Sequence, residues 1–314
     1  MGGYIKFKKE TKRIESKEDF NSLFELQKDL LKNITADLYV PHQFTSKTSF
    51  GDLDVIVPMK YYNRVLSLIL FSDYELEPNF QLTSNTISYQ YNSHQIDLIF
   101  IPEHLVEYAV NYFSYGDHGS LLSRLLKKQS LKNSFLGFYF RFYKDNKQFK
   151  REVLISQDYK DVIETLQLDY KVFQSGFKTE IDMFKWVCSS PHFDKNCYSL
   201  ENLNNKERAR DSKRSFYNNF LDYIHFTENP KDTSIIMNFK HTKVFKENFL
   251  KVCKEYEDLQ KYKNKFNGDL VSNLLDLHEK EVGIFLSKFK KVYMFQDILN
   301  MADDELETNI LNFK

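Results

Sequence analysis

The feature that most constrains this 314-residue chain is a pair of aspartates at the start of a short apolar segment. Asp52 and Asp54 follow Gly51, and the run Val55-Ile56-Val57 then ends at Pro58. β-branched residues favour strands, and a continuous apolar run bounded by turn residues is typical of a buried strand. Because residues two apart on a strand point to the same face, the two carboxylates are expected to project together.

Two neighbouring carboxylates repel each other unless a cation lies between them. Hard ions such as Mg²⁺ prefer oxygen ligands and are typically held by one or two carboxylates together with substrate phosphates. A second short apolar segment, residues 94–102, carries Asp97 near its start. If the two segments pair as neighbouring strands, the aspartates meet at one edge of a sheet. Such a cluster is enough to hold two metal ions about 4 Å apart for phosphoryl or nucleotidyl transfer.

These two segments resemble the palm of the DNA polymerase β superfamily of nucleotidyltransferases. The resemblance rests on Ser-Phe-Gly-Asp-Leu-Asp-Val-Ile-Val at residues 49–57 and on Ile-Asp-Leu-Ile-Phe at residues 96–100. It implies that Asp52, Asp54 and Asp97 are the catalytic residues and the ligands of two Mg²⁺ or Mn²⁺ ions. It also implies that the phosphates of an NTP lie on the turn before the first aspartate.

The segment after the third aspartate is similar to part of the family X polymerases. Residues 112–117 read Tyr-Phe-Ser-Tyr-Gly-Asp, and a serine and an arginine follow. The family has a Tyr-Phe-Thr-Gly…Asn…Arg pattern, which lies along the sugar and base of the nucleotide. The similarity implies that Tyr112, Phe113, Ser120 and Arg124 line a nucleotide pocket.

One position departs from the superfamily pattern. Pro41-His42 stands about ten residues before the first aspartate, where the superfamily usually has Gly-Ser holding the triphosphate. The residues that follow offer other donors, since hydroxyl and ammonium groups bind phosphate. These candidate phosphate ligands are Thr45, Ser46, Lys47, Thr48 and Ser49, and Gly51 in the same turn is a further nucleotide-binding candidate.

The remaining patterns predict an α+β protein with two domains. Residues 1–155 combine helical periodicity with short strand patterns, so we expect a mixed-sheet nucleotidyltransferase palm there. Helical periodicity predominates in residues 156–314, which are expected to form an α-helical domain. A chain of 314 residues is long enough for two such domains with substantial cores.

The helical half has two features that bear on a nucleic-acid partner. Five basic residues fall within residues 206–214, and such a run is either a solvated helix face or a contact for phosphates. Residues 279–286 are similar to a short string in CCA-adding and related RNA nucleotidyltransferases, and we expect Gly283 to permit close helix packing. The basic residues that are candidates for contacting nucleic acid are Lys206, Arg208, Arg210, Lys213 and Arg214.

Composition argues against several other classes of protein. The formal net charge is zero, so the whole chain offers no basic field for nucleic acid. Three cysteines at irregular spacing match neither a disulfide framework nor a zinc site. The chain starts without the apolar core of a signal peptide, and no apolar run is long enough to span a bilayer. We therefore expect a soluble, intracellular protein without a membrane partner, with the cytoplasm favoured.

Together these patterns predict an enzyme that adds NMP from an NTP to a hydroxyl and releases pyrophosphate. The helical second half favours the 3′ end of RNA, of tRNA or poly(A) type, over DNA. Two alternatives stay open. Residues 112–117 favour a family X-like DNA polymerase, and Pro41-His42 favours an inactive palm that binds nucleic acid or protein. The acceptor, the preferred NTP, template dependence and oligomeric state are left open.

Overall fold

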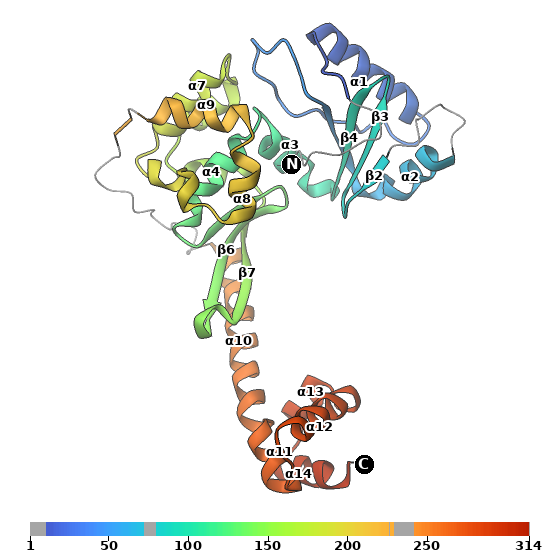
Figure 1. The fold of residues 1–314 in the computed structure, drawn as a ribbon, viewed down its shortest axis with the longest axis vertical. Helices are drawn as coiled ribbons and strands as arrows, with labels where there is room; N and C mark the ends of the chain where they lie inside the picture. Colours follow the sequence, from blue (N-terminus) through green and yellow to red (C-terminus); the bar gives the residue numbers. More distant parts are fainter. Residues whose placement is uncertain (1–10, 72–79, 226, 229–241, 314) are drawn as a thin grey trace. The chain divides into compact units, whose positions relative to one another are not determined.

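The computed structural model describes residues 11–71, 80–225, 227–228 and 242–313. It is an α+β fold with a mixed four-stranded sheet, a three-stranded sheet and a helical C-terminal region (Figure 1). The chain divides into two compact units. The first comprises Met1–Phe142 and Leu154–Thr242, and the second comprises Tyr143–Val153 and Lys243–Lys314. This division differs from the expected boundary at residue 155, because helices after that residue pack against the first unit.

The four-stranded sheet has the strand order β1-β4-β3-β2. Strand β1 (Leu53–Pro58) pairs parallel with β4 (His94–Ile101). Strand β3 (Thr86–Tyr91) pairs antiparallel with both β4 and β2 (Phe80–Leu82). Strands β2 and β3 therefore form a hairpin that leads into the strand carrying Asp97.

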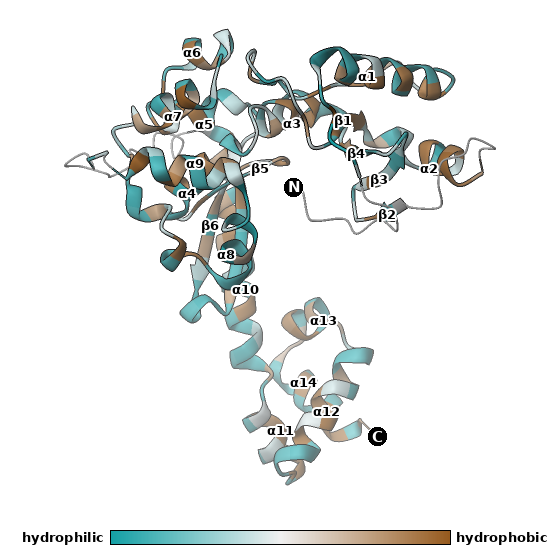
Figure 2. Cartoon of the chain, turned by 45° about the horizontal axis from the view of Figure 1, so that its top comes forward, coloured by the Kyte–Doolittle hydropathy of each residue, from teal (hydrophilic) through white to brown (hydrophobic). Residues whose placement is uncertain are grey.

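Both faces of this sheet are covered, which explains why β1 reads as a continuous apolar run. Val55 and Val57 face a core that includes residues of α1 (Lys17–Leu31) and α2 (Tyr62–Phe71). Ile56 faces the other way and packs with residues of α3 (Val106–Phe113). The apolar character of β1 is visible in Figure 2. Side chains of β1 with the parity of Ile56 therefore project toward the side of α3.

The rest of the first unit is mainly helical. Helix α4 (His118–Lys127) follows α3 after a turn in which Tyr115 and Gly116 have positive φ. Helices α7 and α8 each begin with a capping box, which satisfies backbone N–H groups of the first turn. The later helices of this unit are α5 (Tyr159–Thr165), α6 (Tyr170–Ser175), α7 (Glu180–Cys188), α8 (Asn205–Asp211) and α9 (Ser215–Ile224).

The second sheet has the order β5-β6-β7 and leads into the second unit. Asp145, in the turn between β6 and β7, accepts hydrogen bonds from Tyr256 Oη at 2.7 Å and Gln260 Nε2 at 3.0 Å. The strands are β5 (Leu131–Ser134), β6 (Gly137–Lys144) and β7 (Phe149–Ser156). The helices are α10 (Lys243–Lys265), α11 (Gly268–Leu275), α12 (Glu279–Val292), α13 (Phe295–Asn300) and α14 (Asp303–Asn312). Short 3₁₀ turns elsewhere are Met59–Tyr61, Glu103–Leu105, Asp145–Lys147, Lys195–Cys197 and Leu200–Asn202.

The packing role expected of Gly283 is wrong. This residue lies inside α12, and among the described residues a Cβ there would meet no atom within 4 Å. Glycine inside a helix costs about 0.5–1 kcal/mol relative to alanine. Gly283→Ala is therefore expected to raise the free energy of unfolding by about that amount, measured by urea denaturation.

Gly119 provides the opposite control in the same measurement. A Cβ at Gly119 would lie 2.5 Å from the carbonyl oxygen of Tyr112, so Gly119→Ala should destabilise the protein. A loss of stability in Gly283→Ala would contradict the open environment of that residue.

Candidate metal and nucleotide site

Asp52, Asp54 and Asp97 meet near the start of two adjacent parallel strands. Asp54 lies directly opposite Asp97 in the β1–β4 register, and Asp52 immediately precedes β1. One carboxylate oxygen from each residue lies within 4.8 Å of the others. The two apolar segments do pair as neighbouring strands, and this pairing brings the three carboxylates together.

The alternation of the strands explains why these side chains share one side of the sheet. Asp54 has the parity of Ile56 in β1, and Asp97 has the parity of Ile99 in β4. Both isoleucines pack with Ala109 of α3 in one apolar cluster. The carboxylates are therefore expected to emerge on the α3 side of the sheet, where the apolar cluster ends.

Asp54 and Asp97 lie in an environment that disfavours their charged forms. The pKa of Asp54 is raised to about 8, chiefly by burial and then by the charges of Asp52 and Asp97, while Lys47 opposes the rise. Burial and Asp52 also raise the pKa of Asp97, against hydrogen bonds that stabilise its charged form. Gln95 Nε2 donates to both oxygens of Asp97 at 3.0 Å. Carboxylates that lie this close repel one another, and a cation between them would relieve that repulsion. Carboxylate oxygens are suited to hard divalent cations such as Mg²⁺ or Mn²⁺.

The raised pKa of Asp54 predicts how pH changes the stability of the metal-free protein. An aspartate in the unfolded chain loses its proton near pH 4, whereas Asp54 in the folded protein keeps its proton to about pH 8. The folded state then binds more protons, so the free energy of unfolding falls as pH rises from about 4 to 8. A divalent cation such as Mg²⁺ would bind the carboxylates in their deprotonated form, so we expect Mg²⁺ to raise Tm more near pH 8 than near pH 6.

Thermal denaturation at the two pH values, with and without Mg²⁺, measures this effect. Asp54→Asn should reduce both the pH dependence and the Mg²⁺-induced shift. A Mg²⁺-induced shift of the same size at both pH values and in Asp54→Asn would contradict binding at the aspartates.

A cavity of about 500 Å³ adjoins the aspartates, which is a usual size for a small-molecule site. Its lining includes the turn before β1, the end of α3, the turn into α4 and the start of α9. Asp52 and Asp54 themselves line it. Of the residues predicted for a nucleotide, it contains Lys47, Ser49, Gly51, Tyr112, Phe113 and Ser120.

Four predicted nucleotide residues, Thr45, Ser46, Thr48 and Arg124, are not among the described residues that line this cavity. Thr45 lines a different cavity, and the Ser46 hydroxyl donates to the carbonyl oxygen of Lys178 at 2.6 Å. Arg124 is buried with its guanidinium paired to Asp211. The structure thus gives Arg124 a core ion pair.

The basic run of residues 206–214 divides between different environments. Arg210 and Arg214 line the cavity beside the aspartates. Arg208 instead donates to backbone carbonyl oxygens of residues 200–203, and Lys206 and Lys213 are exposed.

Sequence reasoning missed part of the cavity lining. Among the missed residues, Arg13 donates from Nε to Ser49 Oγ at 3.0 Å, and Phe216 lies over Gly116. Arg13, Glu180 and Phe216 come from segments far from the aspartates in the chain, so no local spacing could have linked them to the site. The missed lining residues are Arg13, Gln43, Phe44, Phe50, Gly116, Asp117, Glu180, Ser215 and Phe216.

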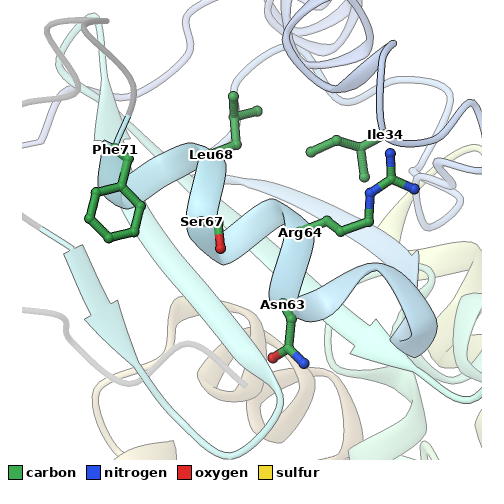
Figure 3. Close-up of a pocket in the computed structure, with 6 residues that line it drawn as sticks. All are labelled: Ile34, Asn63, Arg64, Ser67, Leu68 and Phe71. Carbon is green, nitrogen blue, oxygen red and sulfur yellow. The ribbon is translucent and has the colours of Figure 1, made fainter.

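Two other cavities lack the features of this site. One of about 590 Å³ lies along α2, and Figure 3 shows Arg64 and Phe71 among its six labelled residues. Arg64 Nη2 donates to the carbonyl oxygen of Asn33 there. Another of about 790 Å³ lies against α3 and α6 and is lined by Glu103, Glu107 and several aromatic residues. Within the described ranges, the group of His, Cys, Asp or Glu side chains placed closely enough to hold a metal ion is the one formed by the three aspartates.

No protein-family model matches the chain, and no curated protein sequence matches it either. Any conclusion about function therefore rests on the residues of the chain and their geometry. Among the described residues, none of the helices combines the length and apolar character needed to cross a bilayer.

Proposed function

We propose that the chain is a metal-dependent nucleotidyltransferase that transfers NMP from an NTP to a hydroxyl and releases pyrophosphate. The observation that carries this proposal is the cluster of Asp52, Asp54 and Asp97 on adjacent strands beside a cavity lined by basic residues. Divalent ions bound there, Mg²⁺ or Mn²⁺, would supply positive charge against the phosphates and the leaving pyrophosphate.

The residues of the chain have distinct roles in this proposal. Asp52 and Asp54 would hold both ions, and Asp97 would hold the ion nearest the acceptor. The acceptor oxygen bonds to the α-phosphorus as the bond to the β-phosphate oxygen breaks, and pyrophosphate leaves. Asp97 is suited to take the acceptor's proton, because Gln95 orients its carboxylate and its pKa is raised by burial.

Aromatic side chains give the cavity a surface for a nucleoside. Tyr112, Phe113 and Phe216 line it, and aromatic rings bind bases and sugars by stacking and apolar contact. We propose the 3′ end of RNA as the acceptor, on the helical character of the chain after the palm and the similarity of residues 279–286. DNA and a protein hydroxyl are the competing acceptors.

Incorporation of labelled nucleotides tests the proposal. Each NTP and dNTP is offered with Mg²⁺ or Mn²⁺ on RNA and DNA primers, beside the Asp52→Asn/Asp54→Asn protein. Extension of an RNA primer by the unsubstituted protein alone is the expected result. Extension of DNA only would replace the RNA acceptor. No extension, together with no NTP-induced rise in Tm, would favour an inactive palm and contradict the proposal.

A further inference from the structure

The loop that the superfamily pattern assigns to the triphosphate has much of its backbone hydrogen bonding used internally. The N–H of His42 donates to Ser114 Oγ at 2.8 Å, and the carbonyl oxygen of His42 accepts from Tyr115. Further along, the N–H groups of Thr45, Ser46 and Lys47 donate to the carbonyl oxygens of Phe177, Lys178 and Phe44. An N–H group that already has a good acceptor is a weak candidate for phosphate. The donors for a polyphosphate are therefore expected from side chains.

Arg210 and Arg214 supply such donors from the helical part of the same unit. Both line the cavity that contains Asp52 and Asp54. A guanidinium group carries five N–H donors in a planar fork that matches the geometry of phosphate oxygens. Basic side chains thus lie in the same cavity as the carboxylates proposed to bind metal.

Neighbouring carboxylates position these two arginines in the cavity lining. Arg210 donates to Asp211 from Nε at 2.6 Å and from Nη2 at 3.2 Å, and Asp211 also pairs with the buried Arg124. Arg214 pairs with Asp117 through Nη1. Since an arginine held by a carboxylate loses less side-chain entropy on binding a ligand, these pairs prepare the arginines for an anion.

The charged residues that line the cavity also favour the binding of a polyphosphate. Besides Arg210 and Arg214, Arg13 and Lys47 line it. The opposing carboxylates in the lining are Asp52, Asp54, Asp117 and Glu180. Divalent cations at the aspartates would leave the lining with excess positive charge, which a polyphosphate would neutralise. Helix α9 begins at Ser215 in the same lining, and its positive dipole end adds to the effect.

We propose that Arg210 and Arg214 bind the β- and γ-phosphates of the nucleoside triphosphate, in place of the loop backbone that the superfamily pattern would use. This inference rests on the proposed nucleotidyltransferase function. It also divides the basic residues of the 206–214 run into two groups with different roles. Arg210 and Arg214 recognise the small substrate, whereas Lys206, Arg208 and Lys213 take no part in its binding.

Binding of inorganic tripolyphosphate in the presence of Ca²⁺ tests the proposal without turnover. Isothermal titration calorimetry compares the unsubstituted protein with Arg210→Gln, Arg214→Gln and the control Lys213→Gln. Each arginine variant is expected to weaken tripolyphosphate binding about tenfold or more, because it removes charge-assisted hydrogen bonds. Lys213→Gln should bind as the unsubstituted protein does, since Lys213 is exposed and lies outside the described lining.

Electron paramagnetic resonance of Mn²⁺, without phosphate, separates this inference from the proposed function. The arginine variants are expected to bind Mn²⁺ normally and to keep their near-ultraviolet circular dichroism. Should Arg210→Gln fail to fold, Arg210→Lys replaces it, because lysine keeps the charge and loses the planar fork. An unsubstituted protein that binds neither Mn²⁺ nor tripolyphosphate would overturn both proposals.

Three results would overturn only the assignment of the arginines. The first is unchanged tripolyphosphate binding in folded arginine variants. The second is an equal loss in Lys213→Gln, which would indicate a general charge effect. The third is weakened binding of a short RNA oligonucleotide with unchanged tripolyphosphate binding, which would make the arginines contacts for the acceptor.

Discussion

Asp54→Asn is expected to lower nucleotidyl transfer by about 10²–10³-fold or more, because it removes charge that holds the metal ions. The same substitution should raise Tm of the metal-free protein, measured by thermal denaturation. Burial and the carboxylates of Asp52 and Asp97 raise the pKa of Asp54, so folding must either protonate this carboxyl or bury its charge, and the neutral amide avoids both costs. Opposite effects on activity and stability mark a residue kept for function.

Glu180→Gln is the matched control for this prediction. Glu180 lines the same cavity, but its carboxylate lies outside the aspartate cluster and accepts from Asn219 Nδ2 at 3.1 Å. It should change nucleotidyl transfer less than about tenfold, since it removes charge without removing a metal ligand. Equal losses in Asp54→Asn and Glu180→Gln would indicate that the cavity needs acidic charge in general, contrary to specific metal ligation.

Arg124→Leu is expected to lower the free energy of unfolding by about 3–5 kcal/mol, measured by urea denaturation. The Arg124 guanidinium pairs with Asp211, and both side chains are almost fully buried. It also lies 5.1 Å from the ring centre of Tyr217, so it joins α4 to α8 and α9. Its loss leaves Asp211 buried with one fewer cation.

The pair Lys127–Glu207 is a control on the same two helices. Its atoms lie 3.1 Å apart, and 47% of the Lys127 side chain is exposed. Exposed pairs contribute little, so Lys127→Ala should cost less than about 1 kcal/mol. In the double variant Arg124→Leu/Asp211→Asn, much of the lost stability should return, because the buried charge is gone. A cost for Arg124→Leu as small as that for Lys127→Ala would contradict a structural role for the ion pair.

The aspartate cluster could be predicted because its determinants are local. Asp52 and Asp54 begin one strand and Asp97 lies near the start of another, and two short apolar runs of this kind commonly pair. The helices before and after these strands also followed from their apolar periodicity. The α+β class and the mixed sheet are therefore properties that the pattern of the sequence predicts.

The remainder of the cavity depends on tertiary packing that periodicity does not encode. Arg124 and Arg210 both belong to basic stretches, yet one is buried in an ion pair and the other lines the cavity. The difference arises from Asp211, which lies between helices and attracts both guanidinium groups. Gly283 illustrates the same point. The helical pattern around it indicates the helix face on which it lies, but not whether another element packs against that face.

The most direct test of the proposed function is a crystal structure of the protein with Mn²⁺ and a non-hydrolysable NTP analogue. Anomalous diffraction from manganese locates the metal independently of any assumed chemistry. Manganese is expected on the carboxylates of Asp52, Asp54 and Asp97, with the analogue's phosphates in the adjoining cavity. Manganese and nucleotide bound elsewhere, with the aspartates free of metal, would contradict it.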